Sequence, residues 1–169
     1  MNLHNLKIII NQEVKFTEKE QNFIKDIYQE YFKKLYGHDI FDPFLKVAEI
    51  DNYANTVDII RNTKDLVVIY KSDKLIGIGR MVKSKNKEIR ILELIISEYL
   101  KKYRDIWKYV VSYIENYFMS INYKKMYVEI PLKEGPLLVR AIELGFVENP
   151  DDIKINKEVY TYIVSKELR

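Results

Sequence analysis

Along the first part of the chain, hydrophobic residues change from a short continuous run to a helical repeat. Residues 6–10 form a compact apolar run, which predicts a first strand. Thr17 and Glu20 then form a capping box, in which each side chain can bond the other residue's backbone amide. Apolar residues recur every three or four positions after it and predict a helix that stops at Gly37. They are Phe23, Ile24, Ile27, Tyr28, Tyr31 and Leu35. A second helix is expected at about residues 53–62.

The middle of the chain changes to the short apolar runs of strands. Three such runs cover residues 66–70, 75–82 and 89–96. Polar turns separate them, one at Ser72-Asp73 and one over residues 84–87. Short strands joined by turns of this kind predict an antiparallel meander.

The last part of the chain alternates between helices and strands. Residues 105–121 predict a long amphipathic helix, and residues 126–130 predict the strand that follows it. A strand, helix and strand in this order imply a right-handed crossover to a parallel neighbour. A short helix over residues 137–144 and two further strands, the last over residues 159–164, complete the chain. The expected apolar stripe of the long helix is Tyr109, Val110, Tyr113, Ile114, Tyr117 and Ile121, with Trp107 off the stripe as a candidate cover for a cleft or a partner surface.

The predicted order of elements is β-α-α-β-β-β-α-β-α-β-β. Because no Pro-, Gly- or Ser-rich linker divides the 169 residues, we expect one α/β domain over residues 1–169. The abundance of Lys, Ile, Asn and Tyr is typical of bacterial genomes that are poor in G and C.

Composition narrows the chemistry that the chain can perform. The 28 basic and 25 acidic residues give a net charge of +3 and are interspersed, which does not favour nucleic-acid binding. The absence of cysteine excludes disulfides, thiolate nucleophiles and cysteine-based zinc sites. Only His4 and His38 could supply imidazole ligands, so we expect no metal site. No apolar stretch reaches the ~18–20 residues of a membrane helix, and no export signal is visible, so we expect a cytoplasmic protein without membrane contact.

Several segments, taken in order, resemble the GCN5-related N-acetyltransferase (GNAT) family. Residues 65–81 (DLVVIYKSDKLIGIGRM) are similar to the family's second and third strands. Residues 91–114 (ILELIISEYLKKYRDIWKYVVSYI) lie where the family has its fourth strand, phosphate loop and main cofactor helix. Residues 126–130 (MYVEI) and 137–146 (LLVRAIELGF) resemble its fifth strand and the helix that ends in Gly-Phe. The resemblance implies an α/β (α+β) fold with a mixed, mostly antiparallel central sheet of six to seven strands, flanked by about four helices and splayed between the fourth and fifth strands.

The resemblance also implies acetyl-CoA as a cosubstrate, held where the fourth and fifth strands separate. The pantetheine arm would bond to the exposed strand backbone. The pyrophosphate would lie on amides at the start of the next helix, where free N–H groups and the helix dipole favour an anion. The implied pantetheine contacts are Leu94, Ile95 and Ile96, and the implied phosphate contacts are Lys101, Lys102, Tyr103, Arg104, Asp105 and Ile106.

Two features of the family are missing from this sequence. The family's phosphate loop contains glycines that let phosphate reach the backbone amides, but residues 81–133 include no glycine. Lys101, Lys102 and Arg104 could supply charge in their place; the alternative is a solvated basic loop over a structural helix start. Many relatives carry a Tyr four residues before the Gly of Gly-Phe as a general acid, and here that residue is Ala141.

Glu93 is the candidate general base. An amine is protonated at neutral pH and must lose a proton before it can attack a thioester. Several relatives place a base on the fourth strand, where Glu93 lies. The alternative is a carboxylate that faces solvent or pairs with Arg80 or Arg90.

The acceptor would bind near the end of the first helix, where Tyr31, Tyr36 and His38 are candidates for substrate contact. Aromatic side chains suit a cationic amine; the alternative for each of these residues is an ordinary loop residue. The expected function is transfer of an acetyl group from acetyl-CoA to a primary amine, on a small molecule or a peptide, by direct attack. The alternative is a non-catalytic GNAT-fold module for ligand or protein binding. The oligomeric state stays open, with a homodimer as one option.

Overall fold

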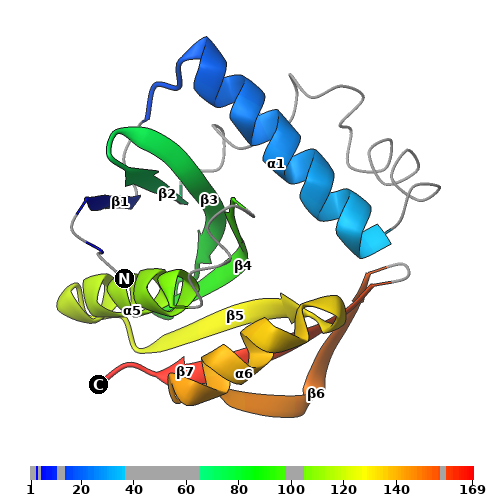
Figure 1. Cartoon of the computed structure of the whole chain (residues 1–169). Coiled ribbons are helices and arrows are strands. Elements are labelled where there is room, and N and C mark those ends of the chain that lie inside the picture. Colours follow the sequence, from blue (N-terminus) through cyan, green and yellow to red (C-terminus); the bar gives the residue numbers. More distant parts are fainter. Residues whose placement is uncertain (1–2, 4, 11–13, 37–64, 98–104, 157–158) are drawn as a thin grey trace.

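The computed structural model describes residues 3, 5–10, 14–36, 65–97, 105–156 and 159–169, which build one seven-stranded sheet with helices on both faces (Figure 1). The strand order is β1-β2-β3-β4-β5-β7-β6, and every neighbouring pair is antiparallel except β4 and β5. The strands are β1 (Leu6–Ile10), β2 (Leu66–Lys71), β3 (Lys74–Lys83), β4 (Glu88–Ile96), β5 (Lys125–Pro131), β6 (Val147–Asn156) and β7 (Val159–Glu167). The helices in the described part are α1 (Glu18–Tyr36), α5 (Ile106–Ser120) and α6 (Gly135–Glu143), with a 3-10 turn η1 (Leu132–Glu134) before α6. The predicted fold class is confirmed, and the helix expected at about residues 53–62 lies outside the described residues.

Two hydrophobic cores hold the helices to the sheet. α1 covers one face of β2, β3 and β4, while α5 and α6 lie on the opposite face (Figure 1). Ile24 of α1 is fully buried against the first face with Val68 and Ile78. Ile114 and Phe118 of α5 are fully buried in the second and larger core. Burial of apolar surface on both faces therefore holds the sheet in place between α1 on one side and α5 and α6 on the other.

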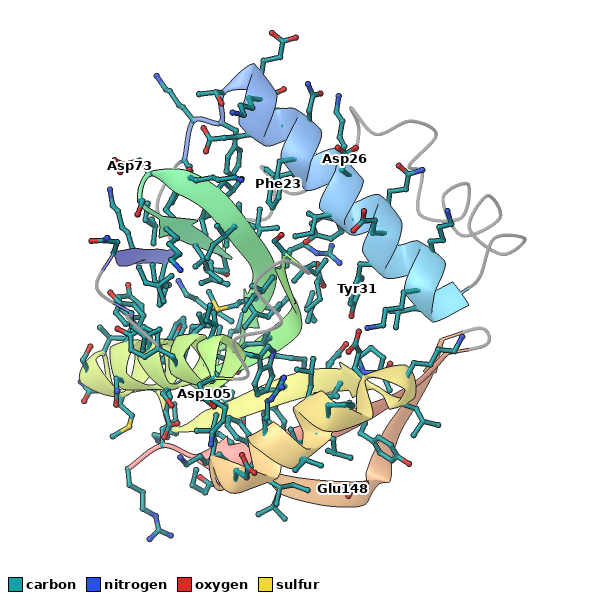
Figure 2. The ribbon with its side chains drawn as sticks, viewed as in Figure 1. Phe23, Asp26, Tyr31, Asp73, Asp105 and Glu148 are labelled. Atoms are coloured by element: carbon teal, nitrogen blue, oxygen red, sulfur yellow. The ribbon has the colours of Figure 1, made fainter. Side chains whose placement is uncertain are left out.

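The start of α1 has the predicted capping box. The Thr17 amide donates to Glu20 Oε1 at 3.1 Å, and the Glu20 amide donates to Thr17 Oγ1 at 3.2 Å. The predicted turn between the first two strands of the meander is also present. Ser72 and Asp73 have positive φ angles of 47° and 62°, which suit a tight hairpin turn, and Figure 2 shows Asp73 at this turn.

The predicted apolar stripe of α5 is partly wrong. Val110 and Ile114 are buried as expected, but Tyr109, Tyr113 and Ile121 are 40%, 42% and 38% exposed. The buried face is instead Ile106, Trp107, Val110, Val111, Ile114 and Phe118. A buried Tyr hydroxyl needs a hydrogen-bond partner, so the neighbouring stripe that carries no Tyr packs at lower cost.

The parallel pairing of β4 and β5 covers only half of β4. It runs from Glu88 opposite Lys125 to Ile91 opposite Val128, and beyond that point β4 continues beside β3 alone. The register against β3 shifts at Leu92, where β4 carries one extra residue. A bulge bends and twists its strand, which accounts for the divergence of β4 from β5. The predicted splay is therefore confirmed.

Candidate active site

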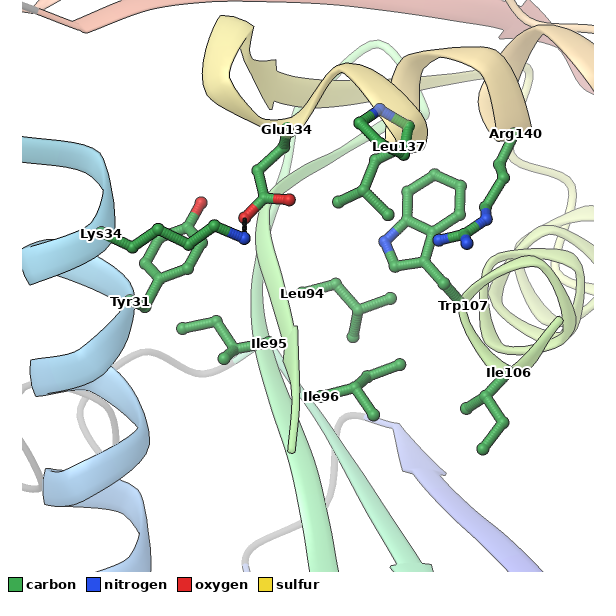
Figure 3. Close-up of a pocket in the computed structure, with 11 residues that line it drawn as sticks. Tyr31, Lys34, Leu94, Ile95, Ile96, Ile106, Trp107, Glu134, Leu137 and Arg140 are labelled. Carbon is green, nitrogen blue, oxygen red and sulfur yellow. Dashed lines mark ion pairs between the residues drawn. The ribbon is translucent and has the colours of Figure 1, made fainter. Parts of the chain in front are cut away.

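A cavity of about 230 Å³ opens where β4 and β5 diverge (Figure 3). One wall is the end of β4, and α5, α6 and α1 supply the others. Apolar side chains predominate among its lining residues. They are Tyr31, Lys34, Leu94, Ile95, Ile96, Ile106, Trp107, Glu134, Pro136, Leu137 and Arg140.

The β4 wall presents backbone groups to the cavity. The Ser97 amide donates to the carbonyl of Ile76 at 2.8 Å, which marks this residue pair as hydrogen-bonded. Because bonded and non-bonded pairs alternate in an antiparallel ladder, the N–H and C=O groups of Leu94 and Ile96 point away from β3. They point to the side where pairing with β5 has ended. Of the three residues of the implied pantetheine site, Leu94 and Ile96 therefore present their backbone groups at the open edge, whereas the backbone of Ile95 pairs with Ile78 of β3.

Two glycines of β3 allow the close packing of this wall. A Cβ atom on Gly79 would lie 2.6 Å from the Glu93 carbonyl oxygen, and one on Gly77 would lie 2.9 Å from the Ile95 carbonyl oxygen. Side chains of Leu94 and Ile96 lie over the same two positions. The glycines thus leave room for the cavity-lining side chains of β4 to lie across β3.

The start of α5 and the side of α6 form the second wall. Ile106 and Trp107 are buried there, and Figure 3 shows Arg140 of α6 beside the Trp107 ring. No acidic side chain in the described part of the chain pairs with Arg140, and the nearby Glu143 pairs with Lys108 at 3.0 Å. A positive charge therefore stands beside the amino-terminal end of α5.

The predicted phosphate contacts lie mostly outside the described residues. This applies to Lys101, Lys102, Tyr103 and Arg104. Asp105 is exposed just ahead of α5, where Figure 2 labels it, and Ile106 lines the cavity. The first hydrogen bond of α5 for which both partners are described joins the Tyr109 amide to the Asp105 carbonyl at 2.9 Å.

An ion pair occupies the end of the cavity next to α1. Lys34 Nζ lies 2.8 Å from Glu134 Oε1, and the ring of Tyr31 stands beside them (Figure 3). Lys133 donates from Nζ to the carbonyl oxygen of Leu35 at 2.7 Å. This bond is a second link between η1 and the last turn of α1. Among the predicted acceptor residues, Tyr31 is thus in the cavity. The side chain of Tyr36, the last residue of α1, and the whole of His38 lie outside the described residues.

Glu93 is buried under α1 and does not line the cavity. Arg80 donates to both of its carboxylate oxygens, at 3.1 Å from Nη2 to Oε2, and the Tyr28 hydroxyl donates to Oε1 at 2.7 Å. Burial and the Glu93 charge raise the pKa of Tyr28 well above 10.0. Burial alone would lower the pKa of Arg80, but the Glu93 charge outweighs it and raises that pKa. The pairing with Arg80 that the sequence left open is the one found, and the role of Glu93 as a base stays a prediction.

Sequence reasoning missed the polar residues of the cavity. Glu134, Lys34 and Arg140 were not candidates for the site. A charged residue in a helix or next to one normally faces solvent. The available signal was the position of Glu134 three residues after β5, the strand at the predicted splay. Ala141, on the buried face of α6, is fully buried in the core and supplies no proton donor.

Helix length and the placement of ionisable side chains bear on membrane and metal contact in the described part of the chain. None of its helices is long and apolar enough to cross a membrane. None of its His, Asp and Glu side chains gather into a group of three or more that could hold a metal ion.

No known family profile and no curated protein matches the sequence. Solved structures do match. Ard1 from Thermoplasma volcanium has a TM-score of 0.67 at 14% identity, covering 98% of this chain and 99% of that chain. A spermidine N-acetyltransferase from Vibrio cholerae, in complex with CoA and spermine, has a TM-score of 0.64 at 14% identity, covering 97% and 96%. The ribosomal-protein-S18-alanine N-acetyltransferase from Escherichia coli has a TM-score of 0.65 at 7% identity, covering 96% and 94%. With its splayed β4 and β5 and nearly full-length overlap with these enzymes, the chain has the GNAT acetyltransferase fold.

Proposed function

We propose that this protein is an N-acetyltransferase that binds acetyl-CoA in the cavity between β4 and β5 and transfers the acetyl group to a primary amine. The observation that carries the proposal is the open backbone edge of β4 at Leu94 and Ile96, inside a largely apolar cavity. A pantetheine arm carries amide groups and can pair with such an edge as an added strand would.

The second wall suits the phosphates of the donor. Amides in the first turn of a helix and the helix dipole attract anions, and Arg140 adds a full positive charge beside the start of α5. A guanidinium group bonds phosphate oxygens through two parallel N–H groups. Arg140 therefore offsets the missing glycines, together with Lys101, Lys102 and Arg104 of the preceding loop.

The transfer step needs few catalytic groups. Once the amine and the thioester lie side by side, proximity supplies much of the rate. Backbone N–H groups of β4 can polarise the thioester carbonyl and stabilise the negative charge that develops on its oxygen. The buried Ala141 cannot protonate the leaving thiolate, so the proton comes from the attacking nitrogen or from water.

A non-catalytic GNAT-fold module is the second candidate. It is favoured by the loop without glycines and by Ala141 in the position of the family's general acid. Such a module would share the fold but would not bind acetyl-CoA.

Donor binding separates the two candidates. Acetyl-CoA at millimolar concentration should raise the melting temperature of the protein, because a ligand that binds only the folded state stabilises it. Leu137→Trp, which fills the cavity, should abolish this shift. Val139→Trp is the matched control on the same helix, since Val139 is 57% exposed and does not line the cavity.

Turnover completes the test. The wild-type protein should acetylate cadaverine or a peptide with a free amino-terminal alanine, with release of CoA thiol detected by a thiol reagent. No melting shift and no thiol release would reject the transferase and leave the non-catalytic module.

A further inference from the structure

Glu134 is a mostly buried carboxylate that points into the proposed transfer site. The residue is 8% exposed and stands at the end of η1, directly before α6. Figure 3 shows its carboxylate directed into the cavity, between the α1 residues and Leu137. Among the described residues that line the cavity, no other side chain is acidic. A charge in such a place needs a partner, which makes the identity of that partner informative.

The partner is a primary ammonium group. Lys34 reaches from the last turn of α1 and places its Nζ atom 2.8 Å from Glu134 Oε1. Its side chain is 43% exposed, whereas that of Glu134 is 11% exposed. The carboxylate is thus fixed in the cavity, while the lysine arrives from the solvent side.

We propose that Glu134 binds the ammonium group of a cationic acceptor and takes its proton, and that Lys34 holds this place until the acceptor arrives. This inference rests on the proposed function and names its substrate class: an aliphatic primary amine that is protonated at neutral pH. Replacing one primary ammonium group by another keeps the buried carboxylate compensated, so the exchange avoids the cost of an unpaired buried charge. The Tyr31 ring, beside the pair, supplies an aromatic face for the cation or its alkyl chain.

Glu93 cannot exchange its partner in this way. Its two oxygens are held by the Arg80 guanidinium, and the Tyr28 hydroxyl adds a third bond. A guanidinium group stays protonated in proteins and is fixed here by paired bonds. Glu93 therefore stabilises the sheet under α1, and Glu134 is the carboxylate that can meet a substrate.

The proton and electron changes balance. The acceptor ammonium gives one proton to the Glu134 carboxylate, and the freed nitrogen lone pair forms a C–N bond with the acetyl carbonyl carbon. The C–S bond breaks with its electron pair on sulfur, and a second nitrogen proton passes to the sulfur. The products are the N-acetyl amide and CoA thiol, and Glu134 returns its proton to water.

Amine binding tests this inference separately from donor binding. Cadaverine should bind the protein saturated with CoA, measured by calorimetry. Glu134→Gln should weaken that binding by about 10- to 100-fold, the loss expected for a hydrogen bond to a charged group, and should leave the acetyl-CoA melting shift in place. Lys34→Met should tighten cadaverine binding several-fold, because the competing ammonium is gone. Lys133→Met removes a lysine that bonds a backbone carbonyl instead and is the matched control, with binding unchanged.

The pH profile tests the proton transfer. Lys34 and Tyr31 on α1, Lys133 on η1 and Arg140 on α6 are the other titratable groups near Glu134. Because Glu134→Gln has no proton acceptor, its turnover should depend on the free amine in solution and recover as pH rises from 7 toward 10. Absence of cadaverine binding to the wild type, equal binding by Glu134→Gln, or a variant profile that matches the wild type would each overturn the inference. If acetyl-CoA does not raise the melting temperature of the wild type, the proposed function is rejected instead.

Discussion

The hydroxyl of Tyr28 on α1 donates a 2.7 Å hydrogen bond to Glu93 on β4, at the strand position next to the cavity wall. The same carboxylate is paired with Arg80 of β3. One buried charge therefore ties a helix and two strands together just after the point where β4 leaves β5. The proposed donor edge begins at the next residue, Leu94, so the position of that edge depends on this cluster.

Replacing Tyr28 by Phe should lower the free energy of unfolding by about 1.5–3 kcal/mol, the range for hydrogen bonds to charged groups. The carboxylate loses a donor in a place that water does not reach, since Tyr28 is 2% exposed. Urea unfolding followed by circular dichroism measures the change. Tyr70→Phe is the control: its hydroxyl also donates to a carboxylate, Glu20, at 2.7 Å, but near the surface, where water can replace it. An equal loss in both variants would contradict the role of the buried cluster.

Stability should fall at alkaline pH, with a contribution from Tyr28. Its pKa is raised in the folded protein, by burial first and by the Glu93 charge second. Above its ordinary value of 10.0, the unfolded chain loses this proton while the folded protein keeps it. The contribution is therefore complete below pH 10 and is lost above it, by at most about 1.4 kcal/mol per pH unit. Unfolding of the wild type and Tyr28→Phe between pH 8 and 11 should show a shallower decline in the variant. Parallel curves would exclude Tyr28 as a source of the decline.

Local signals were sufficient to predict much of this fold. The capping box of Thr17 and Glu20, the turn at Ser72 and the strands of the meander each depend on neighbouring residues. The prediction that β4 and β5 splay apart came from the family resemblance and not from the hydrophobic periodicity. The pair of Lys34 and Glu134 could not be predicted, because its members lie far apart in the sequence and each has an ordinary surface pattern. The α5 stripe failed for a related reason, since only the packed sheet decides which of two adjacent apolar stripes is buried.

Gly79→Ala should destabilise the protein by roughly 1–3 kcal/mol, the cost of an extra methyl in a packed core. The new Cβ atom would lie 2.6 Å from the Glu93 carbonyl oxygen and 2.9 Å from Val67, and backbone must move to accept it. Because this strand pair carries the donor edge, acetyl-CoA affinity should fall as well. Gly135→Ala is the matched control at the start of α6, where a Cβ atom meets nothing within 4 Å. Thermal unfolding and acetyl-CoA titration of both variants measure the effects, and a stable Gly79→Ala variant with full affinity would refute the packing argument.

Arg140→Gln should weaken acetyl-CoA binding by about tenfold or more, because it removes a charged donor beside the start of α5. The remaining affinity should depend less on salt, since fewer charges are left to screen. Lys108→Gln is the matched control: it removes the same charge from the neighbouring helix, but Lys108 pairs with Glu143 and does not line the cavity. Calorimetric titrations of acetyl-CoA at low and high salt measure both effects. If the two variants lose the same affinity, the effect is one of net charge and Arg140 does not bind the phosphates. If only Arg140→Gln loses it, a cation on α6 carries part of the role that the glycine-free loop cannot perform through its amides alone.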